Sequence, residues 1–196
     1  VAYGPAFEGE RVRKEDVQLE CGGGRTAMVE WVTSKRMDEV EDGKIEVIGK
    51  ELTDVPAGSS LPLAIVVEVA GRNMQEDYEP ILERQIHHLI NYAQGVMHIG
   101  QRDIAWLRIS KQAAAKGFKL EHIGVILHAK LHQDFGRIFD KMQIKLYTDE
   151  AKVKQMVEQA KAVYATRDSR IEGMTDETTD MYYSCTLCQS FAPSHV

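Results

Sequence analysis

The sequence predicts an α+β fold: a mixed β-sheet with packed helices, β-rich in its first third and alternating between strand and helix afterwards. Residues 17–21 and 27–32 alternate between apolar and polar side chains, as half-buried strands do. Residues 63–69 form an almost continuous β-branched apolar run, typical of a strand covered on both faces. Beyond residue 80, apolar residues recur at helical spacing between further strand-like runs.

The first third is predicted to contain a surface loop over residues 1–16, then two strands joined as a β-hairpin by the glycine-rich segment 22–26. A phosphate-binding loop is the alternative for that segment. No Gly-Lys-Ser/Thr follows and no helix opens there, so a turn is favoured. Asp42-Gly43 predicts another tight turn, leading into a strand over Lys44–Ile48.

In the second part, Pro80 suits the first turn of a helix whose apolar positions continue to Val96. A short helix capped by Ser110 and a helix containing Phe135 lie between later strands. Those strands are predicted at residues 104–109, 123–128 and 143–147. A last helix begins at Thr148. We expect the α+β domain to span residues 1–165 and a polar, acid-rich linker to span residues 166–181.

The composition is that of a globular protein, with 196 residues, 43% hydrophobic and 28% charged. The net charge of −6 disfavours a nucleic-acid partner, and no apolar run approaches the roughly 20 residues that span a bilayer. Three cysteines argue against a secreted disulfide framework and favour a reducing cytoplasm. No signal peptide is recognisable, and the opening on Val1 suggests a processed or excised piece.

Cys185 and Cys188 are the sharpest chemical signal, because two intervening residues let both thiolates reach one metal ion. A structural zinc or iron–sulfur site needs four ligands, so this pair is half of one. The alternative, a redox dithiol, requires a helix opening at the motif. Pro193 and the nearby chain end leave no room for that helix, so metal binding is favoured.

Two further groups have weaker signals. His128 and His132 are four residues apart, but His128 is predicted to end a strand, so the two need not share a face, and a surface or polar-network role is favoured. Arg102, Trp106 and Arg108 could bind a nucleotide-bearing ligand, because arginine binds phosphate and indole stacks on purines. From residues alone, Trp106 in the core and Arg102 paired with Asp103 or another acid is favoured.

The terminal run Tyr-Tyr-Ser-Cys-Thr-Leu-Cys-Gln-Ser-Phe-Ala-Pro-Ser-His-Val, residues 182–196, closely resembles the start of a known metal-cluster motif. The motif belongs to the CO-methylating acetyl-CoA synthases, the nickel–iron–sulfur subunits that partner carbon monoxide dehydrogenase. Residues 2–10, 98–111, 124–136 and 174–180 resemble the same family, so the resemblance covers essentially the whole chain. The chain resembles the family's middle domain and ends inside the cluster motif.

The resemblance implies a reaction in which a methyl group from a corrinoid iron–sulfur protein, carbon monoxide from the dehydrogenase subunit and coenzyme A form acetyl-CoA. It implies a [4Fe–4S] cluster and nickel in the complete protein, with Cys185 and Cys188 matching the first two cubane ligands. The remaining ligands of the family's pattern lie beyond Val196, so we expect the fragment alone to be inactive, with its cluster absent or incomplete. The family's middle domain is associated with coenzyme A recognition, which raises the interest of Arg102, Trp106 and Arg108.

A competing hypothesis is a non-enzymatic interaction module that binds zinc through Cys185 and Cys188, for example between two chains that each donate two thiolates.

Overall fold

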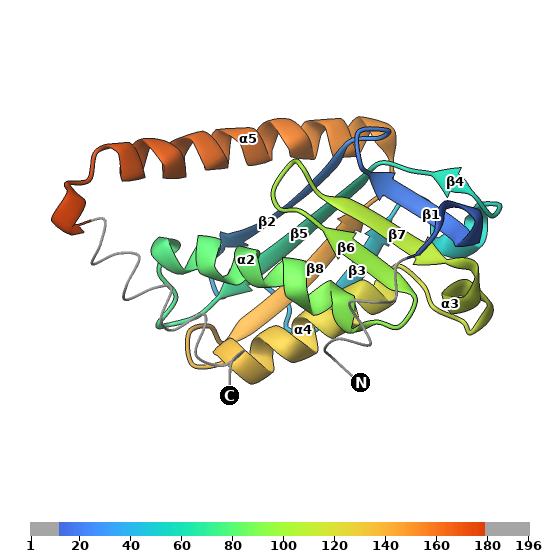
Figure 1. The fold of residues 1–196 in the computed structure, drawn as a ribbon. Helices are drawn as coiled ribbons and strands as arrows, with labels where there is room; N and C mark the ends of the chain where they lie inside the picture. Colours follow the sequence, from blue (N-terminus) through green and yellow to red (C-terminus); the bar gives the residue numbers. More distant parts are fainter. Residues whose placement is uncertain (1–11, 179–196) are drawn as a thin grey trace.

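The computed structural model describes residues 12–178. The predictions for Cys185 and Cys188, for residues 182–196 and for most of the entry loop therefore lie outside the described residues. Within them, two four-stranded sheets are formed, in the orders β4-β1-β7-β6 and β2-β5-β8-β3. This arrangement, with helices packed on mixed sheets, confirms the α+β prediction (Figure 1).

The strands are β1 (Val17–Gly22), β2 (Met28–Ser34), β3 (Ile45–Ile48), β4 (Ser59–Ser60), β5 (Leu63–Ala70), β6 (Val96–Ile99), β7 (Trp106–Ser110) and β8 (Lys141–Tyr147). The α-helices are α2 (Glu79–Leu89), α3 (Lys111–Ala115), α4 (Glu121–Phe135) and α5 (Glu150–Glu172). Single 3-10 turns occupy Lys14–Asp16, Leu52–Asp54, Glu76–Tyr78 and Ile90–Tyr92. No helix in this part of the chain combines the length and apolarity that crossing a membrane requires.

The sheet β2-β5-β8-β3 is covered on both faces, as the apolar run at residues 63–69 predicts (Figure 1). α5 packs on one face, where Val66 of β5 joins a cluster with Val153 and Ala160. α2 and α4 cover the other face, where Val67 lies in the main core. All eight residues of β5 except Glu68 are buried, because helices exclude water from both sides.

The predicted hairpin between the first two strands is wrong. β1 pairs antiparallel with β7 and parallel with β4, whereas β2 runs parallel to β5 in the other sheet. Gly22, Gly23 and Gly24 all have positive φ, so the chain turns out of one sheet and enters the other instead of folding back on itself. The first third is therefore β-rich but not an antiparallel hairpin.

Residues 123–128, predicted as a strand, belong to the helix α4. The buried residues Ile123, Leu127, Leu131 and Phe135 recur every four positions and face the core. Gly124 lies against Ile45, where an added Cβ would come within 2.6 Å of a side-chain methyl group. The strand interpretation failed because it stopped at His128, before the helical repeat could be seen.

Two other boundaries also differ from the sequence prediction. Val96, predicted at the end of a helix, begins β6, because α2 ends at Leu89. The predicted linker from residue 166 is corrected over its first part, because α5 continues without a break through Glu172. Arg167 is buried there, and its guanidinium is held by acidic residues of α2. The polar composition of residues 166–172 predicted a solvent-exposed linker, but polar side chains such as Arg167 are buried when ion pairs neutralise them.

Candidate functional site

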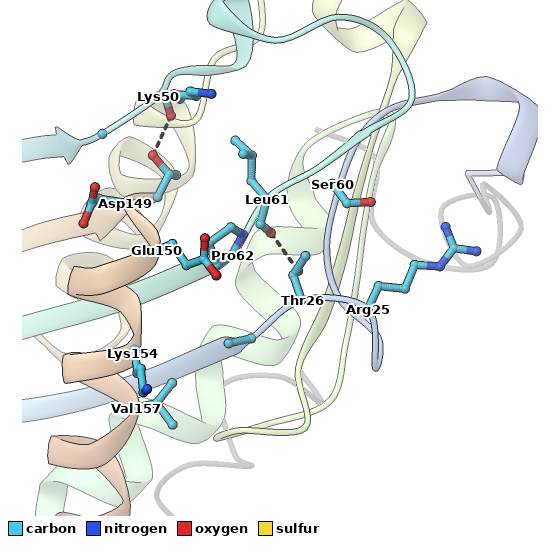
Figure 2. Close-up of a pocket in the computed structure, with 13 residues that line it drawn as sticks. Arg25, Thr26, Lys50, Ser60, Leu61, Pro62, Asp149, Glu150, Lys154 and Val157 are labelled. Atoms are coloured by element: carbon cyan, nitrogen blue, oxygen red, sulfur yellow. Dashed lines mark hydrogen bonds between the residues drawn. The ribbon is translucent and has the colours of Figure 1, made fainter.

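The segment that follows β3 and the residues that follow β8 meet at the start of α5. Asp149 caps this helix by accepting a hydrogen bond from the Lys152 N–H at 3.0 Å. The preceding residue, Thr148, donates its hydroxyl to the carbonyl of Lys50 at 2.8 Å (Figure 2). Gly49 permits this close approach, since an added Cβ would lie 2.5 Å from the Thr148 hydroxyl. The segment after β3 is thus fixed against the start of α5.

A second wall comes from the loop between β1 and β2. Thr26 donates its hydroxyl to the carbonyl of Leu61 at 2.8 Å (Figure 2). It also accepts a hydrogen bond from the Gly22 N–H at 2.9 Å. One threonine side chain therefore ties both ends of the glycine loop to the segment that precedes β5. This loop faces α5 across an open space.

Two adjoining cavities occupy that space, and we call them together the α5 groove. The larger, of about 660 Å³, has three cationic side chains in its lining, Arg25, Lys50 and Lys154, together with Asp149 and Glu150 (Figure 2). The smaller, of about 500 Å³, is lined by residues that include Asp103, Trp106 and Lys161. Both linings share Thr26, Ala27 and Val157, so the cavities adjoin each other beside α5.

Trp106 and Arg108, two of the three residues predicted to bind a nucleotide-bearing ligand, lie together. The Arg108 guanidinium lies 4.6 Å from the Trp106 ring centre, a cation–π contact. Its Nε also hydrogen-bonds to the buried carboxylate of Glu20, and its Nη1 donates to the carbonyl of Val12 at 3.1 Å. Arg108 is therefore committed to protein partners, and it holds one face of the indole.

The indole edge is also constrained. Gly23 lies against it, at a point where an added Cβ would be 2.6 Å from the ring. Among the described residues the Trp106 Nε1 atom finds no hydrogen-bond partner, although it is buried. The tryptophan was expected in the core, but it is half-buried at the wall of the smaller cavity.

Arg102, the third predicted residue, lies elsewhere. Its guanidinium hydrogen-bonds to both carboxylate oxygens of Asp168 at 3.2 Å and lies 4.6 Å from the Tyr164 ring centre. These partners belong to the C-terminal half of α5, and Arg102 lines neither cavity of the groove. The expected pairing with an acid is found, and the acid is Asp168 and not the neighbouring Asp103.

The groove cations Arg25, Lys50 and Lys154 were not singled out from the sequence. They come from the loop between β1 and β2, the segment after β3 and helix α5, far apart in the chain, and no spacing rule connects them. Arg25 also pairs with Glu20 at 3.0 Å, and its side chain is about half exposed. The glycine triplet, residues 22–24, was considered as a phosphate-binding loop and assigned to a turn; it lines the smaller cavity of the groove.

Cys21 is the one cysteine among the described residues. It is fully buried in β1, and burial raises the pKa of its thiol to about 12. Since the thiolate is the form that binds metal, Cys21 is unsuited to act with Cys185 and Cys188.

The histidines of α4 also required a correction. Because residues 121–135 are helical, His128 and His132 share one face, and both ring Nε2 atoms lie 3.0 Å from Oδ1 of Asp42. The polar network expected for them is present. Partial burial raises the pKa of Asp42, but the hydrogen bonds from His128, the Met142 N–H and His132 outweigh it and bring the pKa down to about 2.

The fold and sequence thus define an α+β domain with a groove lined by cationic and acidic side chains, in a chain that also carries a Cys-x-x-Cys pair, Cys185 and Cys188. A family model described as "CO dehydrogenase/acetyl-CoA synthase complex beta subunit" matches residues 1–153, and one that describes the C-terminal part of the ACS/CODH beta subunit matches residues 164–196. The chain belongs to the CO dehydrogenase/acetyl-CoA synthase complex beta subunit family, which confirms the resemblance.

Three relatives illustrate the match. The chain is 53% identical to the carbon monoxide dehydrogenase/acetyl-CoA synthase subunit alpha of Moorella thermoacetica, over 100% of this chain and 27% of that protein. It is 44% identical to the acetyl-CoA decarbonylase/synthase complex subunit beta of Methanothermobacter thermautotrophicus, and 41% identical to that of Methanopyrus kandleri. Each of these two matches covers 100% of this chain and 42% of the relative, so the chain spans less than half of each.

Proposed function

We propose that this chain is part of an acetyl-CoA synthase that condenses a corrinoid-borne methyl group, carbon monoxide and coenzyme A into acetyl-CoA. The names of the relatives support an enzyme of this class that works with a carbon monoxide dehydrogenase subunit. The methyl donor is a corrinoid iron–sulfur protein, and the complex works in the cytoplasm. The contribution of these residues is a binding surface for coenzyme A and two ligands of the metal cluster.

The α5 groove is the coenzyme A site in this proposal, and the observation that carries it is the set of three cations around the larger cavity. Coenzyme A bears a diphosphate and a 3′-phosphate, and Arg25, Lys50 and Lys154 offer positive charge from three directions. Both cavities fall in the range of about 300–1,000 Å³ that small-molecule sites occupy.

The two arginines predicted from sequence take supporting roles. Arg108 orients the Trp106 indole at the wall of the smaller cavity, where the adenine or the pantetheine arm contacts it. Arg102 fixes its loop against α5 through Asp168. Lys161 extends the positive lining into the smaller cavity. The linings also contain Asp103, Asp149 and Glu150, so the four cations leave the groove with a small positive balance. In a chain of net charge −6, this local balance favours a phosphorylated ligand.

Cys185 and Cys188 supply two thiolates to the cluster, whose [4Fe–4S] cubane requires four. The third cysteine of the 196 residues is Cys21, whose burial excludes it as a ligand. The nickel and iron–sulfur cluster supply the carbon–carbon bond-forming chemistry when bound. The isolated 196-residue chain is therefore inactive and does not hold one stoichiometric cubane. Iron and acid-labile sulfide measured at one cubane per chain would contradict this.

The test of the groove is a titration of coenzyme A, followed by isothermal calorimetry and by tryptophan fluorescence. Trp31 is part of β2 and is buried against α5, so a change in emission reports mainly on Trp106, and Trp106→Phe abolishes it. Lys154→Ala weakens binding about tenfold, the loss of one charge-assisted contact. Lys152→Ala is the matched control, because Lys152 is exposed on the same helix and does not line the groove.

Pantetheine, which lacks the nucleotide phosphates, serves as the control ligand and binds far more weakly than coenzyme A. Equal affinities of the two ligands, equal effects of the two lysine variants, or no binding at millimolar coenzyme A would each refute this assignment.

A further inference from the structure

A second cluster of ligand atoms lies away from the α5 groove, on the side of the β2-β5-β8-β3 sheet that α4 covers (Figure 1). It consists of Asp42, from the turn before β3, and of His128 and His132, from α4. None of the three lines either cavity of the groove, and none is used in the function proposed above.

The donor atoms of these residues converge on one point. His128 and His132 lie one helical turn apart, and both Nε2 atoms are 3.0 Å from the same oxygen, Oδ1 of Asp42. All three atoms lie within 4.8 Å of one another. In a tetrahedral site with bonds of about 2.0–2.1 Å, donor atoms are about 3.3 Å apart. The two nitrogen–oxygen distances are therefore within a few tenths of an ångström of that separation. The two nitrogens, at most 4.8 Å apart, reach it by rotation of the imidazole rings.

Neighbouring residues hold the three ligands in place. The Met142 N–H of β8 donates to Oδ1 of Asp42 at 2.9 Å, which fixes the carboxylate. The His132 ring packs edge-on against Phe139, with ring centres 4.7 Å apart. Gly43, with φ of 78°, gives the turn that carries Asp42 a left-handed conformation that favours glycine. The cluster is thus supported from two elements and a turn, which reduces the ordering cost of binding.

The cluster is also reachable from solvent. The side chains of His128, His132 and Asp42 are 25%, 27% and 45% exposed. A metal ion held by three protein ligands keeps at least one position for water, and this degree of exposure leaves room for it.

We propose that Asp42, His128 and His132 form a binding site for a single divalent transition-metal ion, with Zn²⁺ as its representative. Two imidazole nitrogens and one carboxylate oxygen are a donor set that borderline ions prefer, whereas Mg²⁺ and Ca²⁺ prefer all-oxygen sites. The ion would bridge α4 to the turn before β3, and so join the helical layer to the sheet edge.

Binding requires a change of tautomer in both rings. A carboxylate can only accept, so each neutral histidine now donates its Nε2–H to Asp42. When the ion binds, each Nε2 lone pair turns to the metal and the ring proton moves to Nδ1 through solvent exchange. Two N–H···O bonds are replaced by two N–metal bonds and one O–metal bond, with no change in the proton count of the neutral rings.

The experiment uses the full 196-residue chain after chelator treatment, with Cys185→Ser and Cys188→Ser introduced so that their thiolates do not compete for zinc. Calorimetric titration with Zn²⁺ alone, in a non-coordinating buffer, is expected to show one ion per chain. His132→Gln and Asp42→Asn are expected to weaken binding at least tenfold, and the amide introduced by Asp42→Asn retains an oxygen for the Met142 N–H. His122→Gln is the matched control, because His122 lies on the same helix and outside the cluster.

Nitrogen-15 spectra of the imidazole rings provide a readout that a folding defect would not reproduce. Zinc is expected to convert His128 and His132 from the Nε2–H to the Nδ1–H form, and to leave His122 unchanged. The proposal is overturned if no binding is detected at about 100-fold excess of zinc, if His122→Gln weakens binding as much as His132→Gln, or if the tautomers do not change.

Discussion

Arg167 is the residue whose replacement most directly tests the architecture around α5. Its guanidinium donates to Glu83 at 2.7 Å, to Glu79 at 3.1 Å and to the carbonyl of Val32 at 2.8 Å. All three charged residues are at most 9% exposed. In Arg167→Met the methionine keeps most of the volume, but Glu79 loses its ion-pair partner and Glu83 keeps only the Arg102 Nε, 4.0 Å away. Breaking such a pair from one side costs about 3–5 kcal/mol.

The structure favours the lower end of that range. Glu83 keeps a hydrogen bond from the Val32 N–H at 3.1 Å, and Glu79 keeps one from the Ser34 N–H at 2.7 Å. We therefore expect Arg167→Met to lower the free energy of unfolding by about 3 kcal/mol. This is a large share of the roughly 5–15 kcal/mol that stabilises a typical domain. Urea denaturation followed by circular dichroism measures it.

Arg170→Met is the matched control, three residues further along the same helix. Arg170 bonds to Asp77 at 2.8 Å and to Glu76 at 3.0 Å, but its side chain is 41% exposed. Exposed pairs contribute about 0–1 kcal/mol, so the control should change stability by no more than that. Equal losses in the two variants, or a loss below about 1 kcal/mol in Arg167→Met, would refute the reasoning.

The pH dependence provides a second check. Burial raises the pKa of Glu83, while Arg167 acts against this. Without the arginine, the pKa of Glu83 in the folded protein rises further above its ordinary value of 4.5. At neutral pH, folding then requires Glu83 either to take up a proton or to stay charged and unpaired, whereas the unfolded chain keeps it ionised at no cost. The deficit of Arg167→Met relative to wild type should therefore shrink as the pH falls from neutral towards 4.5. A deficit that is constant over this range would show that Glu83 is not the group left unpaired.

Two further predictions concern the inner face of the sheets and the groove loop. Burial lowers the pKa of His98, but the Glu30 carboxylate 2.8 Å away raises it by more, so the net shift is upward. The ion pair should therefore stabilise the fold fully below pH 6.5, the ordinary pKa of histidine, and this stabilisation should be lost as the pH rises through the raised pKa. Glu30→Gln should abolish that loss in urea unfolding between about pH 6 and 9, and an unchanged pH slope would contradict the assignment. Gly23→Ala should destabilise more than Gly24→Ala and shift tryptophan emission, because both glycines have left-handed φ but only Gly23 lies against Trp106. The left-handed penalty of about 1–2 kcal/mol is common to both, so equal losses and unshifted emission would contradict this contact.

The strands and helices with a long, clear repeat could be predicted from the sequence. β5, β8 and the start of α5 lie close to their predicted positions, because their apolar patterns match burial on the faces of one sheet. The pairing of β1 and β2 could not be predicted. Both have strand-like alternation, but their partners β7 and β5 lie far along the chain. A glycine loop of this length is compatible with a hairpin and with a change of sheet.

The error at α4 had consequences for the site. Residues 123–127 read Ile-Gly-Val-Ile-Leu, a short apolar run for which periodicity cannot separate strand from helix. Assigning it to a strand placed His128 and His132 on different elements, and so concealed their shared face. Asp42 was seen only as a turn residue, because its contact with the histidines spans 86 and 90 residues.

The C-terminal half of α5 shows why composition misled at residue 166. Arg167 and Arg170 lie in a polar sequence that resembles a linker. Arg167 is nevertheless buried against two acids of α2, and Arg170 pairs at the surface with Asp77, in the 3-10 turn that precedes α2. The acids that neutralise Arg167 lie 84 and 88 residues away, so no local window contains the reason for its burial. Since the N-terminal half of the same 23-residue helix lines the groove, residues that resemble a linker help to set the position of the wall that carries Lys154.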